Sequence, residues 1–231
     1  MSDFPVIDRL RSGLIVSCQA PPTSPLHDPA VITAIAQACV NQGAAGLRLD
    51  TPAHIRAVRQ AIPNIPIIGL WKQTLPGSSV YITPQYHHAE AVAEAGADII
   101  ALDCTLRDRP AGEDVSVIID RVRHDLKKAV MADVDTLGAA ALANAAGADL
   151  IGTTLFGYTE ATQGQYPPGL DLLRDIIAHF DCLAICEGGI ASPSMARRAL
   201  GLGAFAVVVG TAITGIDLQV QEYCHAIRHP R

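Results

Sequence analysis

The sequence has 231 residues, of which 49% are hydrophobic and 17% charged, and its formal net charge at pH 7 is -6. This length and apolar fraction are enough to bury one sizeable core, so we expect a single domain spanning residues 1–231. The 17 Lys and Arg residues are scattered and form no basic stripe, which argues against a nucleic-acid partner.

Signals for a membrane, for export and for a metal are missing from the sequence. Every apolar run is much shorter than the roughly 20 residues of a membrane-spanning helix, and the opening MSDFPVIDRLRSG has no apolar segment of the secretory kind. The six cysteines lack the paired spacing of metal ligands, and we expect them to be reduced, buried hydrophobes. We therefore predict a cytoplasmic protein with no membrane contact and no metal.

A unit of about 25 to 30 residues recurs along the chain. Each unit has an apolar segment, a short polar or Pro-containing turn, and an Ala-rich helix that ends near a glycine. The apolar segments predict eight strands: Gly13–Gln19, Ala45–Asp50, Pro66–Lys72, Asp98–Asp103, Lys128–Asp133, Asp149–Leu155, Leu183–Glu187 and Ala204–Gly210.

Helix starts are marked by a capping oxygen followed by proline. Four pairs have this form: Asp28-Pro29, Thr51-Pro52, Thr83-Pro84 and Ser192-Pro193. In the fifth helix, Asp135 or Thr136 is expected to be the cap.

Alternation of near-continuous apolar strands with helices indicates a parallel sheet covered by helices. Eight such units predict a single-domain α/β fold, a (β/α)8 TIM barrel. The alternative, an open doubly wound sheet, usually has its glycine fingerprint after the first strand, where this chain has PPTSPLHD. Glycines instead follow the seventh strand (Gly188, Gly189) and end the eighth (Gly210, before Thr211), at the usual phosphate position of a TIM barrel.

Polar residues end most of the predicted strands. In a barrel, residues at these carboxyl ends face the active site, and charges there are costly unless they are paired or used. The residues are Gln19, Arg48, Lys72, Asp103, Asp133, Thr154 and Glu187.

Four of them, Gln19, Lys72, Asp133 and Glu187, come from odd-numbered strands and are expected to form one layer. The third and seventh strands are opposite in a barrel of eight, so Lys72 and Glu187 should lie on either side of a substrate. Such a pair suits removal and return of a proton at a carbon beside a carbonyl. Lys72 must be neutral to act as a base, which Arg48 would favour and the two carboxylates would oppose.

The chain resembles the N-acetylmannosamine-6-phosphate 2-epimerase family along nearly its whole length. The segments that carry the resemblance are GLIVSCQA, PLHDP, IIGLWK, YITP, ALDCTLRDRPAGE, MADVDT, TTLFGYT, ICEGGI and VVVGTAIT. The resemblance implies a barrel of the ribulose-phosphate-binding type that interconverts N-acetylmannosamine 6-phosphate and N-acetylglucosamine 6-phosphate in sialic acid catabolism. It also implies that no metal or organic cofactor is needed.

By the same resemblance, Lys72 and Glu187 are the catalytic residues, and Gln19, Arg48 and Asp133 bind the sugar. Thr154 joins the substrate-binding set as the polar end of the sixth strand. The phosphate is expected on the backbone N–H groups of four residues: Gly188, Gly189, Gly210 and Thr211.

Two positions depart from the family pattern, both beside the expected phosphate site. The family commonly has a basic residue in place of Gly189, and Arg-Pro in place of Gly215-Ile216. Loss of a bidentate arginine would weaken phosphate binding. Arg107, Arg109 or another loop cation is a candidate replacement. The loop 105–113, which contains both arginines, is either a lid or a solvated loop.

Two other functions stay open on the residues alone. Lys72 could form a Schiff base in an aldolase-like lyase, or the barrel could bind sugar phosphates without catalysis. A small-molecule sugar phosphate is the expected partner, with a homodimer as a further candidate.

Overall fold

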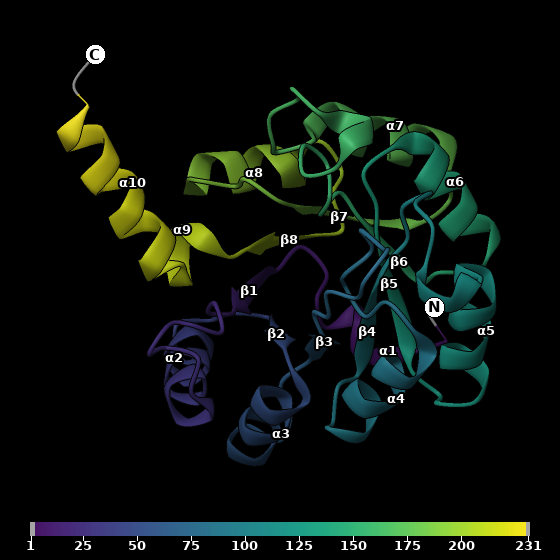
Figure 1. The fold of residues 1–231 in the computed structure, drawn as a ribbon, viewed down its shortest axis with the longest axis horizontal. Helices are drawn as coiled ribbons and strands as arrows, with labels where there is room; N and C mark the ends of the chain where they lie inside the picture. The colour runs from purple at the N-terminus through teal and green to yellow at the C-terminus, as the bar shows by residue number, and fades with distance from the viewer. Residues whose placement is uncertain (1–2, 230–231) are drawn as a thin grey trace.

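The computed structural model describes residues 3–229 and shows a closed barrel of eight parallel strands (Figure 1). Each strand pairs with its neighbours in the chain, and β8 closes the barrel by pairing with β1. The predicted (β/α)8 barrel is confirmed. The strands are β1 (Leu14–Cys18), β2 (Gly46–Asp50), β3 (Ile67–Leu70), β4 (Ile99–Asp103), β5 (Ala129–Asp133), β6 (Leu150–Gly152), β7 (Leu183–Glu187) and β8 (Ala206–Val209).

Helices alternate with these strands and surround the barrel (Figure 1). They are α1 (Pro5–Asp8), α2 (Pro29–Asn41), α3 (Pro52–Ala61), α4 (Tyr86–Glu94), α5 (Val115–His124), α6 (Leu137–Ala145), α7 (Leu170–His179), α8 (Pro193–Gly201), α9 (Thr211–Thr214) and α10 (Ile216–Arg228), with 3-10 turns η1 (Pro110–Gly112) and η2 (Glu160–Thr162). Within residues 3–229 no helix combines the length and the apolar composition that crossing a membrane requires.

Most strand residues are apolar because both faces of the strands are buried. On β1, Ile15 belongs to the cluster inside the barrel, while its neighbour Val16 belongs to the cluster between the strands and the helices. On β3, Ile68 and Ile67 divide in the same way. Two cores on opposite faces of one sheet leave no solvated strand face, so the sequence shows no period-two alternation.

Three of the predicted proline-linked caps are confirmed. The side chains of Asp28, Thr51 and Ser192 accept backbone N–H groups at the starts of α2, α3 and α8. At α6 the cap is Thr136, while Asp135 accepts a hydrogen bond from Thr159 instead.

The prediction of a cap at Thr83-Pro84 is wrong, because α4 begins only at Tyr86. Thr83 is buried with φ of 46°, and its Oγ1 accepts the backbone N–H of Trp71. The first N–H group of α4, that of Tyr86, donates to Glu113 Oε2 at 2.9 Å, a carboxylate 27 residues further along the chain. Thr83 therefore ties its own loop to the end of β3, and a carboxylate from the next loop caps the helix.

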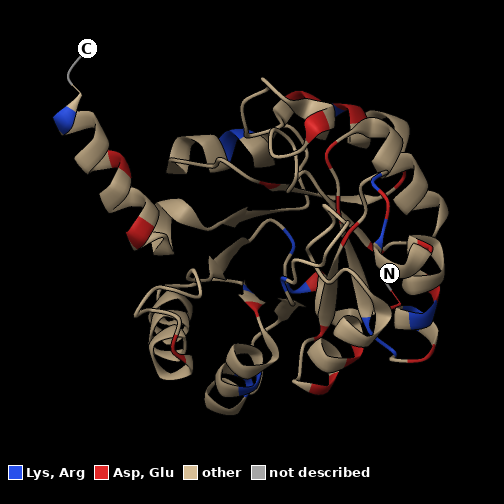
Figure 2. Ribbon diagram, viewed as in Figure 1, with Lys and Arg blue, Asp and Glu red and all other residues tan. Residues whose placement is uncertain are grey.

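The last helix, α10, projects away from the barrel (Figure 1). None of its residues is buried, although large apolar side chains lie along it. Figure 2 shows few charged residues on this helix, while charges of both signs are spread over the helices around the barrel. The exposed apolar residues of α9 and α10 are Ile213, Ile216, Leu218, Val220, Tyr223 and Ile227.

Candidate active site

A buried ion-pair network lies at the carboxyl ends of the strands. Arg48, from β2, donates to both carboxylate oxygens of Asp133, from β5, with Nη1–Oδ1 at 3.1 Å and Nη2–Oδ2 at 2.6 Å. Arg48 is 2% exposed and Asp133 is fully buried. Thr154 Oγ1 adds a hydrogen bond to Asp133 Oδ1 at 2.5 Å. Two parallel charge-assisted bonds of this kind offset the large cost of burying both charges.

The network also includes a residue from outside the odd-numbered strands that were expected to supply one polar layer. The group that joins Asp133 to Glu187 is Arg48, which comes from an even-numbered strand. The layers formed by alternate strands fix only where each side chain leaves its strand. A long arginine side chain can cross the barrel and reach a carboxylate on another strand.

Glu187, the last residue of β7, completes the network. Its Oε1 lies 3.1 Å from Arg48 Nε, but that N–H is not directed at the oxygen, and neither Arg48 Nε nor Glu187 Oε2 has a hydrogen-bond partner. Burial raises the pKa of Glu187 to about 7, because it outweighs the lowering effect of Arg48, and Asp133 raises it further. The Glu187 carboxyl can therefore hold a proton near neutral pH, and one of its oxygens has no hydrogen-bond partner in the protein.

Arg48 itself stays charged. Burial by itself lowers its pKa, but Asp133 and Glu187 act more strongly in total and raise it.

Lys72 lies two residues beyond the end of β3, and both its backbone and its side-chain amine are held by hydrogen bonds. Its Nζ donates to Gln19 Oε1 at 2.6 Å, and its backbone N–H donates to Asp50 Oδ1 at 2.9 Å. Gln19 is oriented in turn by a hydrogen bond from its Nε2 to Ser17 Oγ at 3.0 Å. Gln19 and Lys72, both expected at the barrel mouth, are thus hydrogen-bonded to each other.

The surface of Lys72 is exposed at the barrel mouth, yet many protein atoms crowd around it. The resulting desolvation lowers the pKa of Lys72; Asp50, Glu187 and Asp133 oppose this, whereas Arg48 adds to it. β3 and β7 are four strands apart in a closed barrel of eight, so Lys72 and Glu187 approach from opposite walls.

Three contacts of this site were not predicted from the sequence. Asp50 holds the Lys72 backbone, Ser17 orients Gln19, and the ring of Tyr158 lies against Gly188. Asp50 has a recognisable signal, since it is the charged last residue of a predicted strand. Ser17 and Tyr158 have none, because a strand serine and a loop tyrosine are common at positions with no role.

The glycine turns at the expected phosphate position are tightly packed. Gly188 and Gly189 have φ of 95° and 65°, which side chains rarely adopt. A Cβ on Gly189 would lie 2.6 Å from Pro167 Cβ and 2.7 Å from the Pro167 carbonyl carbon. A Cβ on Gly215 would lie 2.7 Å from Thr211 Cα. The positions where the family commonly has basic residues thus leave no room for a side chain in this conformation.

The turn after β8 offers backbone donors. Gly210 precedes α9, and its carbonyl accepts from Ile213 and Thr214. The first N–H groups of a helix, here from Thr211 onward, have no acceptor within the helix.

Arg107 and Arg109 do not replace the missing cations, so that expectation is wrong. Arg107 binds Asp103, Thr105 and the Ser79 carbonyl, and Arg109 is buried against the Pro84 carbonyl. Both follow β4, which is opposite β8 in the barrel. Their bonds fasten the loop 105–113 to the loop that precedes α4.

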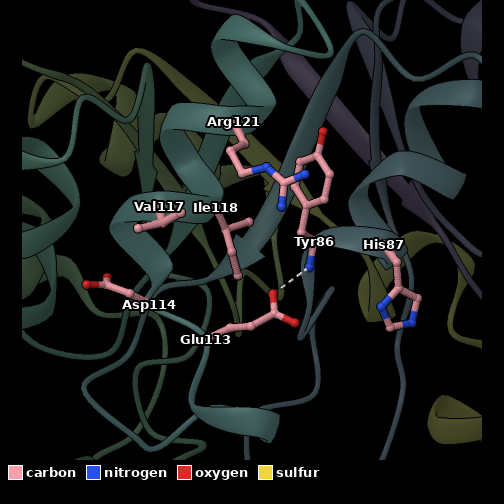
Figure 3. A pocket seen from close by; sticks show the side chains of 7 residues that line it. All are labelled: Tyr86, His87, Glu113, Asp114, Val117, Ile118 and Arg121. Atoms are coloured by element: carbon pink, nitrogen blue, oxygen red, sulfur yellow. Dashed lines mark hydrogen bonds between the residues drawn. The ribbon is translucent and has the colours of Figure 1, made fainter.

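A hollow of about 370 Å³ lies on the outer wall of the barrel, between α4 and α5 (Figure 3). Arg121 stacks on the ring of Tyr86 there, 3.4 Å from its centroid, and Glu113 accepts the Tyr86 N–H. These contacts hold the two helices together, and the hollow shares no residue with the site at the barrel mouth. Among residues 3–229, no group of three or more His, Cys, Asp or Glu is arranged to hold a metal ion.

Comparison with known proteins identifies the family. A family model described as "Putative N-acetylmannosamine-6-phosphate epimerase" matches residues 32–229. A protein of Synechococcus elongatus named "Putative N-acetylmannosamine-6-phosphate 2-epimerase" is 66% identical over 220 residues, 95% of each chain. One of Listeria welshimeri with the same name is 41% identical over 212 residues, 90% of this chain and 89% of the relative.

A solved structure agrees with these matches. The N-acetylmannosamine-6-phosphate 2-epimerase from Clostridium perfringens superimposes with a TM-score of 0.91 and 32% identity, over 97% of both chains. The sequence match over most of the chain and the structural match over nearly all of it agree. This chain belongs to the N-acetylmannosamine-6-phosphate epimerase family.

Proposed function

We propose that the protein interconverts N-acetylmannosamine 6-phosphate and N-acetylglucosamine 6-phosphate by moving a proton at C2 of the opened sugar. The observation that carries the proposal is the pair of proton-transfer groups on opposite walls of the mouth. One carboxylate oxygen of Glu187 has no hydrogen-bond partner, and the Lys72 amine donates to one side-chain acceptor, Gln19. The sialic acid context follows from the family resemblance.

The pKa values of the two groups are displaced toward each other. Desolvation raises that of Glu187 and lowers that of Lys72. Environments that bring an acid and a base close in proton affinity are what proton exchange near neutral pH requires. We assign Lys72 and Glu187 to the two faces of C2, with one transferable proton between them in the working state.

Arg48 has a second role in this assignment. Loss of the C2 proton moves negative charge onto the neighbouring carbonyl oxygen, and a fixed cation in a buried site stabilises such charge. Asp133 holds Arg48 in place, Thr154 donates to Asp133 in turn, and Gln19 is oriented by Ser17. We propose that four residues bind the sugar: Gln19, Arg48, Asp133 and Thr154.

The phosphate is assigned to the turns after β7 and β8, through the N–H groups of Gly188, Gly189, Gly210 and Thr211. Support comes from the left-handed glycine conformations and from the unused first N–H groups of α9. With no arginine at the two family positions, we expect weaker selection for the phosphate than for the sugar.

The test is incubation with N-acetylmannosamine 6-phosphate in D2O, followed by NMR at C2. Epimerisation with deuterium incorporation at C2 supports the proposal, and Lys72→Ala should abolish both. Absence of exchange with every 2-acetamido sugar tried, phosphorylated or not, would refute it. A substrate adduct trapped by borohydride would instead favour the lyase, and binding without exchange would favour a sugar-phosphate-binding protein.

We also propose that the protein forms a homodimer through α10. The apolar side chains of α9 and α10 are uncovered within one chain, and a second copy would bury them. Sedimentation should give a dimer, and Val220→Asp should shift the protein toward monomer; a monomeric wild type would refute this assignment. The unpaired cysteines suit a cytoplasmic location, and the scattered cations give no reason to propose a nucleic-acid partner.

A further inference from the structure

Asp50 lies at the end of the hydrogen-bonded pairing between β2 and β3. It is the last residue of β2 and pairs with Leu70, the last residue of β3, while the Thr51 N–H donates to the Leu70 carbonyl at 3.0 Å. Lys72 lies beyond this ladder, and the Asp50 carboxylate accepts its N–H at 2.9 Å. On the other side, Lys72 forms an isolated antiparallel bridge with Ile82. The carboxylate therefore takes the place of the missing ladder partner.

We propose that Asp50 is a positioning residue for Lys72: its carboxylate fixes the Lys72 backbone at the mouth, and its negative charge favours the protonated amine. This inference deepens the proposed function, because it assigns the control of the proton that Lys72 transfers.

The surroundings of Lys72 give Asp50 this influence. The charged groups that act on the amine are Asp50, Arg48, Glu187 and Asp133, and among them Asp50 has the largest effect. Arg48 is already committed to Asp133 and Glu187. Within residues 3–229, no Lys, Arg or His forms an ion pair with Asp50. The Asp50 charge is thus left to act on Lys72.

His54 is the titratable neighbour of Asp50. It is 2% exposed, its Nδ1 has no hydrogen-bond partner, and its ring packs edge-on against His27. Burial lowers the pKa of His54, and His27 adds to this. A neutral His54 leaves the Asp50 charge unpaired, whereas a protonated His54 would compensate it.

This arrangement has a consequence for the pH dependence of the reaction. The Lys72 and Glu187 pair works when it holds one transferable proton, so the rate should fall at high pH when that proton is lost. Removal of the Asp50 charge makes the ammonium easier to deprotonate. The alkaline limb of kcat/KM should then move to lower pH, while the acid limb moves less.

The chain allows a direct measurement, because it has only three lysines: Lys72, Lys127 and Lys128. The other two lie just before β5, at the opposite end of the barrel. In protein made with 13Cε-labelled lysine, Lys72→Arg identifies the Lys72 signal, and the remaining two signals serve as internal controls. Asp50→Asn retains an oxygen acceptor for the Lys72 N–H and removes the charge.

We expect the Lys72 signal to titrate at lower pH in Asp50→Asn than in the wild type, with the Lys127 and Lys128 signals unchanged. Asp50→Glu keeps the negative charge on a side chain that is one methylene longer. In this variant the Lys72 signal should titrate near the wild-type pH, and kcat should be lower. An unchanged Lys72 titration in folded Asp50→Asn would overturn the proposal. If Asp50→Asn does not fold, a displaced Lys72 titration in Asp50→Glu at unchanged kcat would overturn it.

The titration needs no substrate, so it is separate from the test of the reaction. A wild type without epimerase activity refutes the proposed function, and the shifted Lys72 titration in Asp50→Asn still supports control of Lys72 by Asp50. An active wild type with the same titration in both proteins refutes only the role of Asp50.

Discussion

One part of the barrel mouth is built from charged side chains, and the other from backbone. Arg48, Lys72, Asp133 and Glu187, here called the mouth cluster, are held by ion pairs and by hydrogen bonds of 2.5 to 3.1 Å. The turns at Gly188, Gly189 and Gly210 have no side chains to use.

In the proposed function both parts bind the same sugar phosphate, one through side chains and the other through backbone N–H groups. Charged side chains can transfer protons and change charge, which the proposed chemistry at C2 requires. Backbone N–H groups only donate hydrogen bonds, which is enough to hold a phosphate. The comparison predicts that substitutions in the mouth cluster affect rate and stability together, whereas substitutions in the glycine turns act through shape.

The largest effect is expected for Arg48→Met. Asp133 would then stay fully buried without its cation, and breaking such a pair costs about 3 to 5 kcal/mol of the free energy of unfolding. Urea denaturation measures the loss. Arg11→Met is the matched control, because its pair with Asp8 is exposed and such pairs contribute about 0 to 1 kcal/mol. Similar losses in the two variants would contradict the comparison.

Glu187→Gln tests the proton-transfer role. Glutamine keeps the shape but cannot exchange a proton, so kcat should fall about 10²- to 10⁴-fold. The loss of C2 deuterium exchange measures this, and a variant with wild-type exchange would exclude Glu187 from the chemistry.

The same substitution tests the raised pKa of Glu187. In the folded protein the carboxyl holds its proton up to about pH 7, whereas in the unfolded chain it loses the proton near its ordinary value of 4.5. The folded state thus binds more protons in this window, and its free energy of unfolding must fall as pH rises from about 4.5 to about 7. Urea titrations across this window should show that slope in the wild type and a weaker one in Glu187→Gln; equal slopes would refute the assignment.

Gly189→Arg introduces the residue type that the family resemblance leads us to expect beside the proposed phosphate site. At φ of 65°, and with Pro167 where the Cβ would lie, we expect a loss of about 2 to 4 kcal/mol in the free energy of unfolding. Gly189→Ala separates shape from charge, since it introduces the same Cβ without a cation. A stable Gly189→Arg with a lower KM for the phosphorylated sugar would show that shape does not decide this position.

The smallest effect is expected for Thr154→Val. It removes one hydrogen bond to Asp133 and leaves the Arg48 bonds intact, so the loss should be about 1 kcal/mol. Thermal unfolding measures it against Thr33→Val, which removes a hydrogen bond to a helix carbonyl. A loss as large as that of Arg48→Met would mean that Thr154, not Arg48, dominates the network.

Much of the barrel could be read from local chemistry. Asp28, Thr51 and Ser192 cap helices as predicted, because a capping bond reaches only two or three residues along the chain. Thr83 has the same local signal and does not cap a helix, since its hydroxyl is used by Trp71 and a remote Glu113 caps α4. The failed prediction involves a partner distant in sequence.

The sequence by itself determined the eight strands, their parallel order and the placement of Lys72 and Glu187 near the carboxyl ends of β3 and β7, because repeats, periodicity and caps are local patterns. Only the tertiary structure decided that Arg48 bridges Asp133 and Glu187, that Asp50 holds Lys72, and that Pro167 fills the space beside Gly189. Each of these contacts joins residues from different strands or loops, and side-chain reach and space between them exist only once the barrel has closed.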